Sequence, residues 1–165
     1  MIGDFDSVSP DLAAQMPGTR FVEAADQEMC DLEKAILYAI ERDAERITLT
    51  GCLGRRLDHT LTALSLLIAY HPRCEIRIVC DYCEAFVAEH WTQVSGEPGD
   101  TLSLVTFAPA EGVSVHGVRW PMNDERLLPG SRGVSNEMVL PVARVSVRQG
   151  VVIVIHQRQT QGEPA

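Results

Sequence analysis

Two aspartates near the start of the sequence have the spacing of a divalent-metal site. Asp4 and Asp6 lie one residue apart in the run GDFDS at positions 3–7, directly after a short apolar segment that has the character of a strand end. Carboxylate oxygens suit Mg²⁺, which keeps several waters and usually bridges to substrate phosphates. The run therefore predicts a magnesium site. A plain turn is the alternative, because Asp and Ser are also frequent turn residues.

Two further aspartates stand where strands lead into helices. Asp31 opens the first long helical segment, and Asp58 lies in the run GCLGRRLDH at positions 51–59. In an open parallel sheet such loops emerge at the carboxyl ends of the strands, where ligands bind. We therefore expect these carboxylates to converge although they are far apart in sequence. A favourable charge at the positive end of each helix is the structural alternative.

The turn before Asp58 contains residue types that suit an anion. The guanidinium groups of Arg55 and Arg56 can each form paired hydrogen bonds to a phosphate. Gly51 and Gly54 leave backbone N–H groups free to approach an anion where the helix begins. A solvated pair of surface arginines is the alternative. No G-x-x-x-x-G-K-[ST] pattern occurs, which excludes a P-loop kinase.

The elements that would position these residues change character along the chain. In the first half, helical periodicity over 28–43 and 57–70 alternates with strand-like runs at 20–23, 46–50 and 75–80. Strands and helices that alternate in this way indicate a parallel α/β sheet. We therefore predict a parallel-sheet, Rossmann-like α/β domain over residues 1–85.

The second half contains strand-like runs without helical periodicity. These runs, separated in many places by Gly and Pro, cover 84–89, 91–94, 101–107, 113–118, 138–147 and 151–156. Short strands at this spacing are typical of an antiparallel sandwich or jelly roll. We therefore predict a second domain, an antiparallel β-sandwich, over residues 86–158.

Composition limits the classes of partner. The formal net charge of −9 over 165 residues disfavours nonspecific binding to nucleic acid or anionic membranes, since both require an excess of Lys and Arg. No run of about 18 apolar residues suggests a membrane-spanning helix. No signal-peptide pattern is seen, so we expect a cytoplasmic protein.

The cysteines favour free thiols. Their number, five, is odd, which argues against a complete disulfide framework. Cys80 and Cys83 form one C-x-x-C pair, but a structural zinc site would require a second pair of ligands at suitable spacing. We therefore expect small buried side chains rather than metal ligands at these positions.

Taken in order, the motifs resemble the thiamine pyrophosphokinase (thiamine diphosphokinase) family. The matching segments are GDFDS at 3–7, DQEMCDLEKA at 26–35, GCLGRRLDHTL at 51–61, GVRWPM at 117–122 and GVSNE at 133–137. The resemblance implies transfer of a diphosphate group from Mg²⁺-bound ATP to the hydroxyl of thiamine, with release of AMP. It also implies a homodimer, in which the α/β domain of one subunit and the sandwich of the other form the thiamine pocket.

The resemblance also implies a role for each matching residue in the α/β domain. Asp4, Asp6 and Asp31 would hold magnesium and phosphates, and Gln27 would lie beside the nucleotide phosphates. Such transfer depends on positioning and on charge neutralisation more than on covalent catalysis. Asp6 and Asp31 therefore count among the expected catalytic residues as well as the metal ligands.

The remaining assignments follow from the two later motifs. Arg56 would face the phosphates, and Asp58 would orient thiamine or help to accept its proton. Ser135 and Asn136 would help to form the thiamine pocket. A hydroxymethyl-dihydropterin pyrophosphokinase is the alternative with the same chemistry, but the GVSNE segment and the long β-rich region favour thiamine. A non-catalytic thiamine-binding or dimerisation relative is the alternative from another class.

The sequence departs from the family pattern at several positions. The family usually has Gly, Thr, Asp and Asn where this chain has Arg55, Cys30, Glu28 and Ala63. Family members also have a segment before GDFDS, with an Ala-Asp-Gly-Gly nucleotide motif, that this sequence lacks. We therefore expect the α/β domain as written to be incomplete, to bind Mg·ATP weakly and to be marginally stable.

The metal-site assignment predicts the effect of one substitution. In any active form, Asp6→Asn should abolish turnover and leave the fold intact, because an amide cannot neutralise the charge of a metal and its phosphates. Turnover is measured as AMP release in a coupled assay, and the fold by circular dichroism. Turnover near that of the wild type would refute the assignment.

Overall fold

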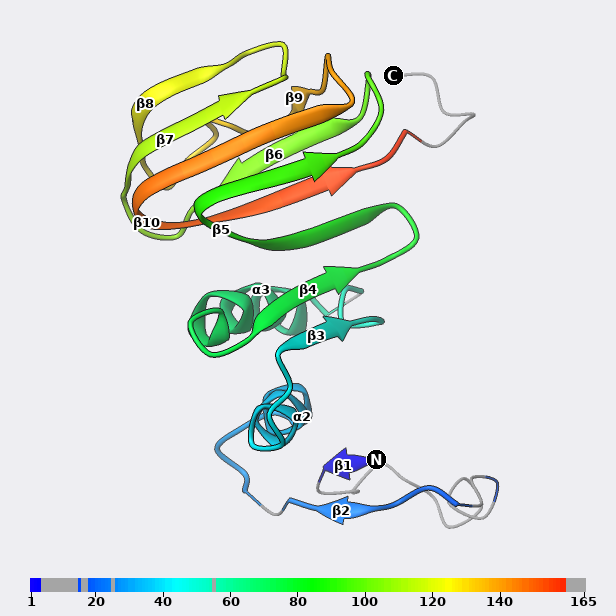
Figure 1. Cartoon of the computed structure of the whole chain (residues 1–165). Coiled ribbons are helices and arrows are strands. Elements are labelled where there is room, and N and C mark those ends of the chain that lie inside the picture. The colour runs from blue at the N-terminus through cyan, green and yellow to red at the C-terminus, as the bar shows by residue number, and fades with distance from the viewer. Residues whose placement is uncertain (4–14, 16–17, 25, 55, 160–165) are drawn as a thin grey trace. The chain divides into compact units, whose positions relative to one another are not determined.

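The computed structural model describes residues 1–3, 15, 18–24, 26–54 and 56–159, which form two compact units, Met1–Ile47 and Thr48–Ala165 (Figure 1). The predicted metal ligands Asp4 and Asp6 lie outside the described residues, as does Arg55. Within the part of the chain that is described, no helix combines the length and the hydrophobicity required to cross a membrane.

Among its described residues, the first unit contains a short parallel strand pair and helix α2 (Asp31–Ile40). Strand β1 (Ile2–Gly3) pairs in parallel with β2 (Val22–Glu23), and helix α2 contacts β1. The helix is shorter than the predicted 28–43. At its start, the backbone N–H of Glu28 donates to the Asp26 carboxylate at 2.8 Å, which holds the preceding residues in a turn.

The second unit contains helix α3 (Leu57–Tyr70), which has the predicted bounds. The strands of the main sheet are β3 (Arg46–Leu49), β4 (Glu75–Val79), β5 (Cys83–Ser95), β6 (Thr101–Val105), β7 (Ala110–His116), β8 (Met122–Leu127), β9 (Asn136–Glu137) and β10 (Val142–Gln157). The chain is therefore a mixed α/β protein in which most of the regular structure is β, which confirms the predicted class at this coarser level.

Two long strands, β5 and β10, form the centre of this sheet (Figure 1). They pair antiparallel along their length. The first part of β10 also pairs with β7, and its last part pairs with β6. Strand β8 then pairs with β7, and β9 with β6. One strand therefore connects two groups of neighbours, and the runs predicted separately at 138–147 and 151–156 contribute to one continuous strand.

The change of partners on β10 occurs at a bulge. The register of β10 against β5 shifts between Val147 and Val152, and Gly150 within this interval has a φ of +92°. A Cβ atom at Gly150 would lie 3.0 Å from the carbonyl oxygen of Pro109 and from the Cα of Ala110. Both the backbone conformation and the space therefore require glycine.

The apolar core of the second unit is formed by buried side chains of β5, β6, β7, β8 and β10. Its members on β10 include Ala143, Val145 and Val147 before the bulge and Val152 and Val154 after it, all buried. Alternate residues point into this cluster on each side of the bulge, and after the bulge Ile153 on the opposite face of the strand is buried as well. The extra residues restore the inward phase after the bend.

The bulge predicts that Gly150→Ala destabilises the protein by about 2 kcal/mol, because alanine at positive φ would be strained and would contact neighbouring backbone. Chemical denaturation measures the loss. Gly130→Ala is the matched control, since a Cβ there meets nothing closer than 3.9 Å. Equal losses in the two variants would contradict this explanation of the bulge.

Candidate functional site

The carboxylate of Asp31 lies against the end of strand β1. A Cβ atom built on Gly3 would lie 2.8–3.0 Å from the carboxylate atoms of Asp31, so only glycine leaves room for this approach. The backbone N–H of Ala24 donates to the carbonyl of Gly3 at 2.9 Å. The exposed Gln27 lies in the segment that directly follows this strand pair. The chain thus brings the residue that precedes Asp4 next to Asp31.

Asp31 also has a partner within its own helix. The ammonium group of Lys34, which is buried, lies 3.2 Å from the Asp31 carboxylate. This pair compensates the buried charge of the lysine, since an unpaired buried ammonium group is costly. The described residues contain no group of three or more His, Cys, Asp or Glu side chains placed to hold a metal ion. The hard carboxylate of Asp31 beside Gly3 nevertheless has the donor type that Mg²⁺ takes.

Arg56 and Asp58 form an exposed, bidentate ion pair at the start of α3. The Arg56 Nη2 lies 2.5 Å and the Nε lies 3.2 Å from the two carboxylate oxygens of Asp58. The hydrogen bonds from Arg56 lower the pKa of Asp58 to about 2. The same pairing raises the pKa of Arg56. Asp58 is therefore ionised at neutral pH and is a weak proton acceptor.

A small cavity of about 200 Å³ lies beside strand β9. Its lining residues are Trp120, Ser131, Arg132, Gly133, Val134 and Asn136. The volume is below the usual range for a drug-sized ligand, so the cavity suits one ring or one small group. The cavity contains the predicted pocket residue Asn136 and adjoins Ser135, which has a φ of 58° and donates its N–H to the hydroxyl of Ser103 at 2.9 Å.

The side-chain amide of Asn136 forms three hydrogen bonds with the backbone. Its oxygen accepts hydrogen bonds from the N–H groups of Trp120 at 3.0 Å and Glu137 at 2.9 Å, and its nitrogen donates to the carbonyl of Trp120 at 2.6 Å. Asn136 is buried, whereas 53% of Trp120 is exposed. The geometry therefore makes Asn136 a support for Trp120, whose indole is the group that can contact a ligand.

Sequence reasoning did not assign Trp120 a role. The signal was present, because Trp120 stands in the GVRWPM segment. Trp120 and Val134 are both exposed and line the same cavity, and exposed apolar side chains that gather at one place are typical of a binding surface.

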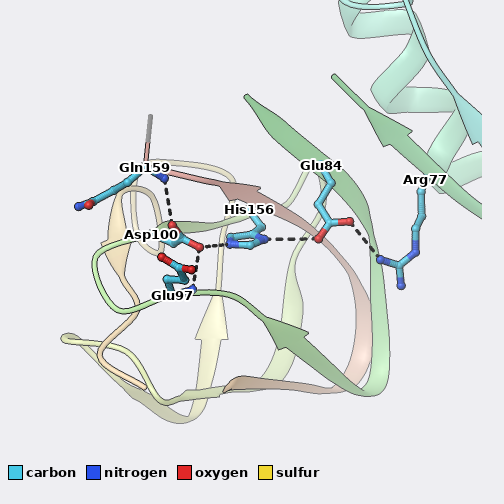
Figure 2. Close-up of polar contacts among 6 residues, drawn as sticks. All are labelled: Arg77, Glu84, Glu97, Asp100, His156 and Gln159. Carbon is cyan, nitrogen blue, oxygen red and sulfur yellow. Dashed lines mark hydrogen bonds and ion pairs between the residues drawn. The ribbon is translucent and has the colours of Figure 1, made fainter. Parts of the chain in front are cut away.

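A buried polar network, shown in Figure 2, was also missed. His156 is 2% exposed; its Nε2 lies 2.8 Å from the Asp100 carboxylate, and its Nδ1 lies 3.4 Å from that of Glu84. His156 continues the inward phase of Val152 and Val154 on β10, so the alternation alone indicated an inward histidine that would need partners.

Asp100 links this network to the cavity. Besides His156, its carboxylate accepts hydrogen bonds from the N–H groups of Glu97 at 2.9 Å and Gln159 at 3.0 Å (Figure 2). Its carbonyl accepts the N–H of Met138 at 2.8 Å. Met138 follows β9 directly, so the network fixes the strand that contains Asn136.

The network has room beside Gly96 only because glycine has no side chain. A Cβ atom there would lie 2.7 Å from both the Asp100 carboxylate and the His156 ring. Burial raises the pKa of Asp100, but the hydrogen bonds from Glu97, Gln159 and His156 outweigh burial, and the net effect lowers the pKa. The ionised form of Asp100 is therefore the form that the fold stabilises.

We expect Asp100→Asn to destabilise the protein by about 3 kcal/mol near neutral pH, because it removes one partner of a buried pair. The contribution of ionised Asp100 is present above its ordinary pKa of about 3.9 and is lost as the pH falls through the lower folded-state pKa. The difference between wild type and variant, measured by denaturation, should therefore shrink between about pH 5 and pH 2.

The control for this substitution is Asp124→Asn. Asp124 pairs with Arg148 at 3.1 Å on the surface, and exposed pairs contribute about 0–1 kcal/mol. A loss in Asp100→Asn that equals the control, or that is unchanged across the acidic range, would contradict the role assigned to Asp100.

Comparison with known families gives two matches that follow each other along the chain. The profile "Thiamin pyrophosphokinase, catalytic domain" matches residues 1–79. The profile "Thiamin pyrophosphokinase, vitamin B1 binding domain" matches residues 91–152. The second match includes Trp120 and Asn136, so the cavity lies within the region that this profile describes.

Individual proteins similar to this chain are thiamine pyrophosphokinases by name. Thiamine pyrophosphokinase of Bacillus subtilis is 24% identical over 161 residues, which cover 93% of this chain and 75% of that protein. Thiamine pyrophosphokinase 2 of Arabidopsis thaliana is 28% identical over 150 residues, which cover 81% of this chain and 56% of that protein. This chain therefore spans three quarters of the bacterial relative and just over half of the plant relative.

Solved structures show the same fold. The crystal structure of thiamine pyrophosphokinase from Bacillus subtilis superposes with a TM-score of 0.85 at 22% identity, over 96% of this chain and 78% of that chain. Thiamin pyrophosphokinase from Candida albicans gives a TM-score of 0.80 at 16% identity, over 94% and 72%. At these identities the likeness concerns the fold alone.

Proposed function

This chain belongs to the thiamine pyrophosphokinase family, and from that premise we propose that it transfers the diphosphate group of ATP to the hydroxyl of thiamine and releases AMP. The observation that carries the proposal is the cavity beside the exposed Trp120, which falls inside the vitamin B1 binding match. The hydroxymethyl-dihydropterin alternative is not favoured, because both matched profiles are those of thiamine pyrophosphokinase.

We assign the phosphate end of the reaction to the first matched region. Asp4, Asp6 and Asp31 would hold Mg²⁺, and Gln27 would lie beside the nucleotide phosphates. The bound metal would neutralise charge on the phosphates during transfer. The close approach of Asp31 to Gly3 supports this assignment, since Gly3 immediately precedes Asp4 in the chain.

Arg56 and Asp58 would act at the transferred group and the acceptor. Arg56 presents a guanidinium that can turn from Asp58 to a phosphate, because the ion pair is exposed and therefore weak. When Arg56 turns to a phosphate, the main cause of the lowered pKa of Asp58 is removed, but even the ordinary pKa of an aspartate, about 3.9, makes Asp58 a poor general base at neutral pH. We therefore infer that Asp58 orients the thiamine hydroxyl by accepting its hydrogen bond.

Trp120 would hold the acceptor by stacking on a ring of thiamine. An indole face attracts aromatic and cationic rings, and thiamine contains an aminopyrimidine and a positively charged thiazolium. Asn136 would act through Trp120 by fixing its backbone, and Ser135 would line the adjacent turn. The cavity has room for one ring only, so the rest of thiamine would lie outside it.

The remaining organisation is proposed on the resemblance. Residues 1–85 would form the Rossmann-like catalytic domain and residues 86–158 the thiamine-binding β-sandwich. The first of these contains both helices α2 and α3, and the second contains strands only among the described elements. A cytoplasmic homodimer, in which the sandwich of one subunit completes the site of the other, would supply the missing wall of the small cavity.

The test is AMP release by the purified protein with Mg·ATP and either thiamine or hydroxymethyl-dihydropterin. We expect AMP and thiamine diphosphate in equal amounts with thiamine, and no AMP above background with the pterin. AMP formed with the pterin alone would reject the proposal. Thiamine binding without any AMP would establish the non-catalytic alternative instead.

The stacking role of Trp120 gives a second prediction. Trp120→Ala should raise the KM for thiamine about tenfold and leave the KM for ATP unchanged, because one aromatic contact contributes about 1 kcal/mol or slightly more. Trp91→Ala is the matched control, since Trp91 is another exposed tryptophan and lies on β5. Equal effects of the two substitutions on the KM for thiamine would contradict the assignment.

A further inference from the structure

The turn between β4 and β5 holds two cysteine sulfurs in contact. The Sγ atoms of Cys80 and Cys83 lie 3.2 Å apart, and both are free thiols. The backbone N–H of Cys80 donates to the carbonyl of Cys83 at 2.9 Å, and the strand register pairs Val79 with Glu84. Cys80 and Cys83 therefore stand directly opposite each other at the end of an antiparallel pair.

This position suits a disulfide. Hydrogen-bonded residues opposite each other in an antiparallel pair have Cα atoms about 5.5 Å apart, a distance within the common range for disulfides. Formation of the bond between Cys80 and Cys83 therefore requires side-chain rotation and little backbone movement. Residues 81 and 82 of the turn are exposed, and Cys80 is half-buried, so a small reagent can reach the pair from solvent.

The surroundings make the two thiols unequal. Burial raises the pKa of Cys80, but hydrogen bonds from the Cys83 thiol and from the N–H groups of Tyr82 and Cys83 outweigh burial and lower it. Burial, followed by the neighbouring Cys80, raises the pKa of Cys83. Cys80, which is half-buried, is therefore the thiol that ionises and reacts more readily, and Cys83, which is buried, is the second thiol.

A zinc site at this turn is less well supported than a disulfide. The described residues contain no set of three His, Cys, Asp or Glu side chains placed to hold a metal, so zinc has no ligand set among them. Of the remaining thiols, Cys74 is buried, and burial raises its pKa. Burial, with a smaller contribution from the nearby Cys80, raises the pKa of Cys52. Cys52 is therefore the competing partner for Cys80 in any oxidation.

We propose that Cys80 and Cys83 form a thiol–disulfide exchange site that takes low-molecular-weight disulfides such as glutathione disulfide. The Cys80 thiolate attacks one sulfur of the external disulfide, whose S–S bond breaks and releases one glutathione thiolate. Cys83 then gives its proton to solvent and attacks the Cys80 sulfur, which releases the second glutathione. The protein dithiol is oxidised to a disulfide, and the external disulfide is reduced to two thiols.

The positions of the tryptic sites make the test direct. After denaturation, trypsin places Cys80 and Cys83 together in the peptide 78–119, whereas Cys30, Cys52 and Cys74 fall in the separate peptides 21–34, 47–55 and 74–77. The protein is equilibrated in glutathione buffers of increasing oxidised fraction, quenched with acid, alkylated and digested. Mass spectrometry then reports the state of each thiol.

We expect the 78–119 peptide to lose two hydrogens and to resist alkylation, while the peptides with Cys52 and Cys74 remain alkylated. Cys30 is an exposed free thiol, so it serves as the internal control and forms only a mixed disulfide. A cross-link between peptides 47–55 and 78–119, or full alkylation of the 78–119 peptide at every glutathione ratio at which Cys30 is modified, would overturn the proposal.

Two variants test the order of the steps. Cys83→Ser should accumulate the mixed disulfide of Cys80 with glutathione, because no second thiol resolves it. Cys80→Ser should react with glutathione disulfide at least about tenfold more slowly at neutral pH, because the remaining thiol is buried and protonated. Equal rates in the two variants, with circular dichroism showing both folded, would contradict the assignment of Cys80 as the nucleophile.

Discussion

The pairing of β5 with β10 is the constraint on which the rest of the second unit depends. β10 pairs with β5 along its length and also contacts β7 before its bulge and β6 after it. The bulge at Gly150 allows one strand to have both sets of neighbours and still point alternate residues inward. The positions of β6, β7 and, through them, β8 and β9 all follow from this strand.

The same strand supports the candidate ligand cavity. Near its end, His156 occupies an inward position that an apolar residue would otherwise fill, and its two carboxylate partners make that position tolerable. The carbonyl of Asp100 accepts the N–H of Met138, two residues after Asn136. The side chain of Asn136 in turn hydrogen-bonds both the N–H and the carbonyl of Trp120. Buried hydrogen bonds therefore hold the backbone of Trp120 in place while its indole is exposed, as a pre-organised binding surface requires.

The helices and most strands could be predicted, because the spacing of apolar residues within one segment is enough to indicate them. The apolar spacing over 57–70 gave α3 with its observed bounds. The helix predicted over 28–43 begins only at Asp31, because a side-chain turn at Asp26 competes with its first residues, and it ends at Ile40. Strand β8 (MNDERL) has three consecutive charged residues, Asp124 to Arg126, which interrupt the alternation of apolar and polar residues that marks a strand. The pairing of His156 with Asp100 joins residues 56 positions apart and has no local signature. The roles of Asp4 and Asp6 stay predictions, since both lie outside the described residues.

Phosphorus-31 NMR of the reaction mixture shows whether the protein moves a diphosphate group as one unit. With Mg·ATP and thiamine, we expect the single resonance of AMP together with the two coupled resonances of thiamine diphosphate, growing in equal amounts. Resonances of ADP with thiamine monophosphate, or of ADP with free phosphate, would show transfer of a single phosphoryl group and would contradict diphosphate transfer.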